Sequence, residues 1–214
     1  MINIYNKDCL EAMREMSDKQ FDLAIVDPPY GIDIAKNGSL GTDKFKAKNW
    51  DKETPRQEFF NELIRVSKNQ IVWGYNYMTD KLPPCKGFIY WNKLNHHDNR
   101  SDGELAYTSF DKLARHFEYM WDGNRYGFKS AIKGVGKKSI RIHPTQKPVK
   151  LYEWLLMNYA KEGDKILDTH LGSGSIAIAC HNLGYDLEGY ELDKEYYDNA
   201  LKRIKNHQAQ LRII

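Results

Sequence analysis

A carboxylate and an aromatic ring stand close together in the segment Asp27, Pro28, Pro29 and Tyr30. This segment directly follows the apolar run at residues 21–26, which is typical of a buried strand. Two prolines cannot continue the hydrogen-bond ladder of a sheet, so the strand must end there in a rigid turn. Ligands of open α/β sheets bind at the carboxyl ends of the strands, so the turn predicts a site that uses Asp27 and Tyr30.

A second turn, which contains Gly172 and Gly174, lies between a predicted strand at residues 165–168 and a predicted helix at residues 175–183. The two glycines permit a tight turn and close approach of a ligand, and the helix that follows offers unpaired N–H groups. Glu191 ends the next predicted strand, 17 positions after Gly174, where it can accept hydrogen bonds from both hydroxyls of a ribose. This order of elements predicts a nucleotide-type site.

The same unit is also compatible with NAD, because residues 172–177 satisfy the dinucleotide fingerprint with Ala in the last place. Its position in the chain argues against NAD. The unit begins near residue 164, whereas a dinucleotide fold needs a second mononucleotide half downstream. A single cofactor that carries one adenosine fits the remaining length better.

Short apolar runs alternate with amphipathic stretches along the chain, which indicates βαβ units around a mostly parallel sheet. Strands are predicted at residues 21–26, 70–74, 87–91, 105–110, 116–121, 165–168 and 187–191, and helices at residues 8–16, 56–67, 148–160, 175–183 and 194–206. No linker rich in Pro, Gly or Ser separates two halves. We therefore expect one α/β domain that spans residues 1–214.

Composition indicates a globular protein: 41% of the 214 residues are hydrophobic, 29% are charged and the net charge is +3. The apolar runs are short and the N-terminus lacks the hydrophobic region of a signal peptide, so we expect neither a membrane span nor export. The three cysteines are far apart and have no His at zinc spacing, which predicts reduced thiols, no metal site and a cytoplasmic protein.

Positive charge is concentrated in residues 123–150, which contain eight Lys and Arg residues and no Asp or Glu. Such a run is consistent with a polyanionic partner. It is equally consistent with a solvated loop, so the run alone decides nothing.

The Asp27–Tyr30 turn, followed by the segment His143, Pro144, Thr145, Gln146, Lys147 and Pro148 and then by Asp168-x-x-x-Gly172-x-Gly174, resembles the β group of DNA amino-methyltransferases. Those enzymes transfer a methyl group from S-adenosylmethionine (SAM) to an exocyclic nitrogen of a DNA base. The likeness covers nearly the whole chain, with three motifs in the family's order, and is closest in kind to the N6-adenine methylases of phages and mobile elements.

The resemblance implies a permuted Rossmann-like SAM-dependent methyltransferase fold with a mostly parallel sheet and helices on both faces. The catalytic half would span about residues 1–122 and the SAM-binding half about residues 143–214. A short basic target-recognition segment, about residues 123–142, would lie between them. Permutation would explain why the glycine turn comes late in the chain.

The resemblance also implies roles for individual residues. The catalytic set would be Asp27, Pro28, Pro29 and Tyr30, in which the Asp27 carboxylate and the Pro28 carbonyl accept hydrogen bonds from the amine while Tyr30 stacks on a flipped base. The cofactor would contact Asp8, Asp27, Lys147, Asp168, Leu171, Gly172, Ser173, Gly174 and Glu191. Lys147 would meet the methionine carboxylate of SAM, Asp8 either caps a helix or lies beside the cofactor adenine, and Leu171 departs from the aromatic residue that the family usually has.

We therefore expect a SAM-dependent enzyme that methylates adenine N6 of a base flipped out of double-stranded DNA, in a bacterial or phage-infected cell, with or without a restriction partner. The contacts to DNA are expected from Arg125, Lys129, Lys133, Lys137, Lys138 and Arg141. A segment this short implies either a brief recognition site or a homodimer that shares the work. N4-cytosine methylation, RNA methylation and a noncatalytic SAM- or DNA-binding module stay open as alternatives, although the last is disfavoured because Asp27 and Tyr30 are both kept.

Overall fold

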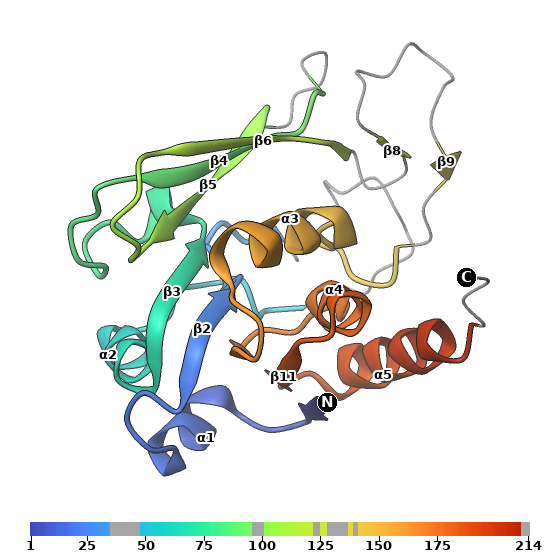
Figure 1. Cartoon of the computed structure of the whole chain (residues 1–214), viewed down its shortest axis with the longest axis horizontal. Helices are drawn as coiled ribbons and strands as arrows, with labels where there is room; N and C mark the ends of the chain where they lie inside the picture. Colours follow the sequence, from blue (N-terminus) through green and yellow to red (C-terminus); the bar gives the residue numbers. More distant parts are fainter. Residues whose placement is uncertain (35–47, 96–100, 122–124, 128–136, 139–140, 211–214) are drawn as a thin grey trace.

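The central feature of the computed structural model is a large mixed sheet (Figure 1). The structure describes residues 1–34, 48–95, 101–121, 125–127, 137–138 and 141–210. Within these residues the large sheet has eight strands, in the order β1 (Ile2–Tyr5), β11 (Asp186–Tyr190), β10 (Lys165–Asp168), β2 (Phe21–Val26), β3 (Ser67–Trp73), β5 (Gly103–Thr108), β4 (Phe88–Asn92) and β6 (Arg115–Glu118). Of these strands β5 alone runs against the others, because it pairs antiparallel with both of its neighbours. The sheet is therefore mostly parallel, as predicted.

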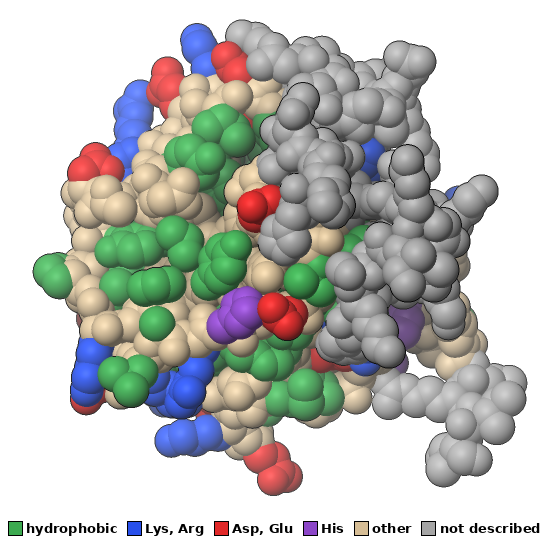
Figure 2. Space-filling view, turned by 90° about the horizontal axis from the view of Figure 1, so that it is seen from above, with side chains coloured by type: hydrophobic (Ala, Val, Ile, Leu, Met, Phe, Trp, Pro, Cys, Tyr) green, Lys and Arg blue, Asp and Glu red, His purple; other side chains and the backbone are tan. Residues whose placement is uncertain are grey.

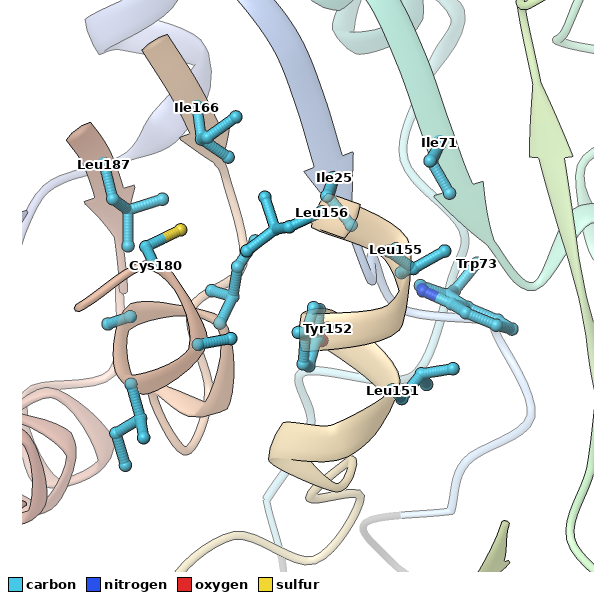
Figure 3. Packing of buried hydrophobic residues seen from close by; sticks show 14 of the residues in the cluster. Ile25, Ile71, Trp73, Leu151, Tyr152, Leu155, Leu156, Ile166, Cys180 and Leu187 are labelled. Carbon is cyan, nitrogen blue, oxygen red and sulfur yellow. The ribbon is translucent and has the colours of Figure 1, made fainter. Parts of the chain in front are cut away.

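Helices cover both faces of this sheet. The helices α3 (Val149–Tyr159), α4 (Ser175–Leu183) and α5 (Lys194–Gln208) contribute to one buried cluster, and α1 (Cys9–Glu15) and α2 (Gln57–Val66) contribute to a second. Figure 3 shows Leu151 and Leu155 of α3 directed toward Trp73 of β3, and none of these three side chains is exposed. This arrangement confirms the predicted fold class, a Rossmann-like α/β fold.

The predicted strand at residues 116–121 is wrong in its extent. It divides into β6 and the short β7 (Met120–Trp121), which belongs to a second sheet with β8 (Arg125–Gly127) and β9 (Lys137–Lys138). The last residue pair between β4 and β6 is Asn92 with Glu118, so the chain beyond Glu118 has no further strand of the large sheet to pair with. The edge strand β1 has only four residues and escaped prediction altogether.

The strands β2 and β10 lie side by side at the point where the connections diverge. From β2 the chain passes through α2 to β3 on one side, and from β10 it passes through α4 to β11 on the other. A crevice at the carboxyl ends of the strands is the usual ligand site at such a switch point. Both predicted turns, after β2 and after β10, open onto this edge. No helix among the described residues has the length and apolar composition needed to cross a membrane.

Candidate active site

A cavity of about 380 Å³ opens at the switch point between β2 and β10, within the range of roughly 300–1,000 Å³ that is usual for small-molecule sites. Its lining includes eight residues that the sequence pointed to, namely Asp8, Asp27, Pro29, Lys147, Leu171, Gly172, Ser173 and Glu191. Of the remaining predicted site residues, Pro28, Tyr30, Asp168 and Gly174 lie near the cavity without lining it. The cavity thus joins the turn after β2 to the turn after β10.

The turn after β10 depends on its two glycines. Gly172 and Gly174 have φ values of +52° and +71°, which residues with a side chain rarely adopt. A Cβ atom on Gly174 would also lie 2.9 Å from Cδ1 of Ile204 in α5, which is too close. The Gly172 position has more room, since its Cβ would lie 3.6 Å from the ring of His143. Conformation therefore requires the first glycine, and both conformation and packing require the second.

Glu191 fixes this turn from the end of β11. Its Oε2 accepts a hydrogen bond of 2.9 Å from the backbone N–H of Gly172, and its Oε1 accepts one of 2.9 Å from the N–H of Asp193. Burial raises the pKa of this carboxyl group, whereas the two N–H donors act in the opposite direction. A carboxylate has about four lone-pair sites, so Glu191 can still accept hydrogen bonds from two hydroxyl groups of a ligand.

An aromatic wall completes this end of the cavity. His143 packs edge-on against Tyr196 with ring centroids 4.3 Å apart, and the ring centroid of Trp50 lies 5.5 Å from that of His143. Burial lowers the pKa of His143 to about 3, so the imidazole is neutral at physiological pH. Flat apolar walls beside a carboxylate and a glycine turn fit an adenosine group, and hence SAM, which carries one. The sequence offered no pattern that marked Trp50 or Tyr196.

At the other end of the cavity, Asp27 belongs to a buried cluster of charges. Lys147 Nζ lies 2.6 Å from Asp27 Oδ2 and 2.8 Å from Glu104 Oε2, and its side chain is only 4% exposed. The Tyr30 hydroxyl donates a hydrogen bond of 2.6 Å to Asp27 Oδ1. Burial raises the pKa of Asp27, and the Lys147 ammonium opposes this shift. The Asp27 side chain retains 16% exposure, on the side of the cavity.

The turn that carries Asp27 is held by hydrogen bonds to its backbone and by packing against the Tyr30 ring. Asp51, which is 2% exposed, accepts hydrogen bonds of 2.7 Å from Tyr30 N and 3.1 Å from Gly31 N. The Tyr30 ring stacks on Tyr77 with centroids 5.2 Å apart and planes inclined by 18°. It also lies against Gly74, where a Cβ atom would come within 2.3 Å of Tyr30 Cε1. The position of Tyr30 therefore depends on contacts with two other segments, one at Asp51 and one at residues 74–77.

The amino-acid sequence matches the family model N6_N4_Mtase, described as DNA methylase, over residues 88–202, which is more than half of the chain. The chain belongs to this DNA methylase family. It is 28% identical over 248 residues to the Type II methyltransferase M2.DpnII of Streptococcus pneumoniae, with 94% of this chain and 89% of that protein covered.

Two solved structures resemble this methylase in fold. A crystal structure of an M1.HpyAVI–SAM complex matches with a TM-score of 0.58 at 25% identity and covers 95% of this chain and 100% of that chain. The putative DNA modification methylase TTHA0409 from Thermus thermophilus, also in complex with SAM, matches with a TM-score of 0.62 at 16% identity and covers 99% and 98% of the two chains. The methylase is a SAM-dependent DNA methyltransferase, and the predicted enzyme class and cofactor are confirmed.

In the structure the Lys147 ammonium contacts other side chains, so its expected contact with the methionine carboxylate of SAM stays a prediction. Its ammonium has three N–H donors, and they are directed at Asp27 Oδ2, Glu104 Oε2 and the Tyr30 hydroxyl, the last at 3.2 Å. No donor of this group is left for a cofactor carboxylate in this arrangement. Lys147 lines the cavity as the partner of the Asp27 and Glu104 carboxylates.

Glu104 and Lys93 are members of this cluster that the sequence did not reveal. Lys93 Nζ lies 2.6 Å from Glu104 Oε1, and the two lysine ammonium groups hold the pKa of Glu104 well below its usual range despite burial. Glu104 is the second residue of β5, the strand that runs antiparallel to its neighbours. Its place in the segment Ser101–Leu105, which the family resemblance covers, was the one hint that the sequence contained.

The remaining cofactor residues divide between structural and open roles. Asp8 caps α1 by accepting hydrogen bonds from Leu10 N and Glu11 N, and it also lines the cavity, so both of its expected roles are compatible with the structure. Leu171 is 4% exposed and packs against Gly189 of β11. Asp168 is 2% exposed and accepts a hydrogen bond of 3.0 Å from His170 N, so it stabilises the glycine turn from behind.

Of the expected DNA contacts, Lys129 and Lys133 lie outside the described residues, and for Arg125, Lys137 and Lys138 only the backbone of β8 and β9 is described. Arg141 does not fit the expectation. It is 6% exposed, with its guanidinium near the Pro144 carbonyl, so it presents no solvent-facing charge to a phosphate.

Figure 2 shows that hydrophobic side chains occupy the middle of the described part of the upper face, with Lys and Arg toward its margin. Among the described residues no group of three or more His, Cys, Asp or Glu is placed to hold a metal ion.

Proposed function

We propose that this methylase transfers the methyl group of SAM to N6 of an adenine that is flipped out of double-stranded DNA. The observation that carries the proposal is the shared cavity, which is lined by Asp27 at one end and by Gly172 and Glu191 at the other. An adenosine-bearing cofactor held by Gly172 and Glu191 therefore has Asp27 as its neighbour. A base amine bound to Asp27 lies within the same enclosure.

The chain's contribution to the reaction is orientation. When bound, SAM supplies the methyl group, so that the bond from N6 to carbon forms as the sulfur–carbon bond breaks, the electron pair stays on sulfur and one amine proton must leave. Asp27 and the Pro28 carbonyl would accept the two amine hydrogens and direct the nitrogen lone pair toward the donor. Holding the reacting atoms within about 3–3.5 Å and aligned supplies several kcal/mol of barrier reduction. The Asp27 carboxylate would also be the acceptor for the proton that leaves.

Tyr30 would bind the flipped base by stacking. Extrusion of a base from a duplex costs a few kcal/mol, and stacking on an aromatic side chain returns roughly 1–3 kcal/mol. The Tyr30 ring is suited to this role because Pro28, Pro29 and the Asp51 hydrogen bonds already restrict its backbone. Tyr77 stacks on Tyr30 and is 43% exposed, so the pair forms an aromatic platform beside the cavity.

Adenine is the preferred substrate because the first residue of the turn is Asp27. In the family that the sequence resembles, Asp-Pro-Pro-Tyr accompanies adenine N6 and Ser-Pro-Pro-Tyr accompanies cytosine N4. The matched family model includes both activities, so it does not choose between them.

The proposal includes a division of the chain and a setting for the reaction. Residues 1–122 would form the catalytic half, residues 123–142 would contact the target and residues 143–214 would bind SAM, with homodimerisation as the way in which a short recognition segment covers a longer site. The relative M2.DpnII is named a Type II methyltransferase, which supports a role in restriction and modification.

Incubation with labelled SAM and unmethylated genomic DNA, followed by nucleoside analysis, tests this function. We expect N6-methyladenine as the product, whereas N4-methylcytosine or no transfer to DNA would each contradict the proposal. Asp27→Asn should abolish transfer and keep SAM binding. Asp22→Asn is the matched control, since Asp22 lies at the opposite end of the same strand and pairs with Lys68 there.

A further inference from the structure

The cluster around Lys147 contains more charged groups than the chemistry of Asp27 alone requires. Besides Asp27, Lys147 contacts Glu104, and Glu104 in turn contacts Lys93 with its other oxygen. The Glu104 and Lys93 side chains are 21% and 17% exposed, so the cluster is held largely away from water. Burial of ions is costly unless each is paired and hydrogen-bonded, so an arrangement of four needs an explanation.

We propose that Glu104 is a positioning residue for methyl transfer: it shares the Lys147 ammonium with Asp27, so that the Asp27 carboxylate keeps charge available for the amine of the target base. This inference rests on the proposed function, since it deepens the role of Asp27. Paired with Asp27 alone, Lys147 would largely neutralise the acceptor that the amine needs. Glu104 takes up part of the ammonium's charge at 2.8 Å, and Lys93 compensates Glu104 at 2.6 Å.

The geometry of the strands makes this sharing possible. Glu104 pairs in register with Trp91 of β4, and Ala106 pairs with Trp73, the last residue of β3. Glu104 therefore lies beyond the end of β3, at the same edge of the sheet as Asp27. The Tyr30 hydroxyl lies between the two carboxylates, 2.6 Å from Asp27 Oδ1 and 3.2 Å from Glu104 Oε2, so the two acids and the lysine form one connected group.

Asp27 is influenced by charges from every element packed around it. Lys147 precedes α3, Glu104 lies on β5 and Tyr30 lies in the same turn, while Asp168 of β10 and Tyr152 of α3 interact with Asp27 over a longer range. Glu104 and Lys147 act on Asp27 with opposite sign, because a negative neighbour raises the pKa of a carboxyl group and a positive neighbour lowers it. Neutralising each of them separately should therefore move the protonation of Asp27 in opposite directions.

The test compares Glu104→Gln and Lys147→Met with the wild-type protein, using kcat at saturating DNA and SAM over pH 5–9. For Glu104→Gln we expect kcat to fall about tenfold while the KM for DNA and the Kd of SAM change by no more than about threefold. The acidic limb of its pH profile should move to lower pH, and that of Lys147→Met to higher pH, each by about one unit. A structural role alone would lower stability without this opposite displacement.

Glu62→Gln is the matched control, because Glu62 is 20% exposed and pairs with Arg65 on α2, away from the cavity. It should leave kcat and the pH profile unchanged. SAM binding and thermal melting report whether each variant is folded. If Glu104→Gln does not fold, Glu104→Asp is measured instead: it keeps the charge on a shorter arm, so it should lower kcat and leave the acidic limb in place, and wild-type kcat would overturn the proposal.

Asp27→Asn separates this inference from the proposed function. If Asp27→Asn methylates DNA as fast as the wild type, the function assigned to Asp27 fails and the role of Glu104 fails with it. If Asp27→Asn is inactive but Glu104→Gln has wild-type kcat and an unmoved acidic limb, the positioning role of Glu104 alone is refuted. Displacement of both limbs in the same direction would refute it as well.

Discussion

Replacing Glu191 by Gln should both destabilise the protein and weaken SAM binding. The loss of stability is expected because this carboxylate accepts hydrogen bonds from two backbone donors. Gly172 N and Asp193 N each donate to a different oxygen of Glu191. Gln has one acceptor oxygen, so its NH₂ group must face one of these N–H donors and leave it without an acceptor. An unsatisfied donor of this kind costs about 1–3 kcal/mol, and we expect that loss in the free energy of unfolding.

The loss in cofactor affinity is a separate quantity. A hydrogen bond from a ribose hydroxyl to a charged acceptor contributes about 1.5–3 kcal/mol, and 1.4 kcal/mol corresponds to a factor of ten in Kd. Loss of one such bond therefore predicts a roughly 10- to 150-fold weaker Kd for SAM. Displacement of the glycine turn at Gly172 would weaken SAM binding further, so the Kd of Glu191→Gln should rise by at least this much.

Calorimetric titration with SAM measures the Kd, and competition by adenosine and 2′,3′-dideoxyadenosine isolates the hydroxyl groups. The wild type should prefer adenosine, and Glu191→Gln should lose most of that preference. Glu188→Gln is the control, since Glu188 lies on β11 just before Glu191, accepts a hydrogen bond from the Tyr190 hydroxyl and does not line the cavity. An unchanged preference for adenosine in Glu191→Gln would refute the ribose role, even if SAM binding were weaker.

Three further perturbations have defined outcomes. Gly74→Ala places a Cβ 2.3 Å from Tyr30 Cε1, whereas the control Gly163→Ala has a similar positive φ and no atom within 4 Å of its Cβ. Both variants should lose about 1–2 kcal/mol of stability from the left-handed backbone, but only Gly74→Ala should also lower kcat. Equal effects of the two variants on kcat would contradict the Tyr30 contact. Lys137→Ala/Lys138→Ala should make the dependence of log K for DNA on log salt less steep by about 1.8 if both contact phosphates, with unchanged SAM affinity, and an unaltered slope would exclude those contacts. Burial raises the pKa of Asp168 to about 8, so between about pH 4 and 8 the folded protein holds a proton on Asp168 that the unfolded chain has lost. The stability that this proton contributes falls by up to about 1.4 kcal/mol per pH unit as pH rises. Across that window, urea unfolding should therefore show the free energy of unfolding of Asp168→Asn rising relative to that of the wild type. Buried His143 and His170 contribute equally to both proteins. Parallel curves of this free energy against pH would contradict the raised pKa of Asp168.

Local patterns in the sequence were sufficient for the two turns of the site. Paired prolines after an apolar run end a strand, and glycines before a helix permit close approach of the backbone, so Asp27 and Gly172 could be placed without knowledge of the rest of the chain. The strand at residues 165–168 and the helix at residues 175–183 have the bounds that were predicted, because each contains buried apolar residues and is flanked by a clear turn.

Partners from distant segments could not be inferred in this way. Asp51 supports the backbone of Tyr30 and Gly31, but it stands in a polar stretch where an Asp is unremarkable. β1 exists as a strand because it pairs with β11 at the opposite end of the chain, and its four residues carry too little periodicity to show this. The contact of Lys147 with Asp27 likewise depends on the path of the chain before α3, so neither the basic run nor the family resemblance indicated it.

Glu104 shows why a search for acids at the carboxyl ends of strands is incomplete in this fold. In a parallel sheet such a search finds Asp27 after β2, Asp168 at the end of β10 and Glu191 after β11. β5 runs in the opposite direction, so the residue that reaches the same edge is near its beginning. The reversal brings a fourth acid to the edge, and its charge is balanced there by Lys93 and Lys147 rather than by solvent. In a mixed sheet the antiparallel strand must therefore be examined at its amino end for residues that act on the site.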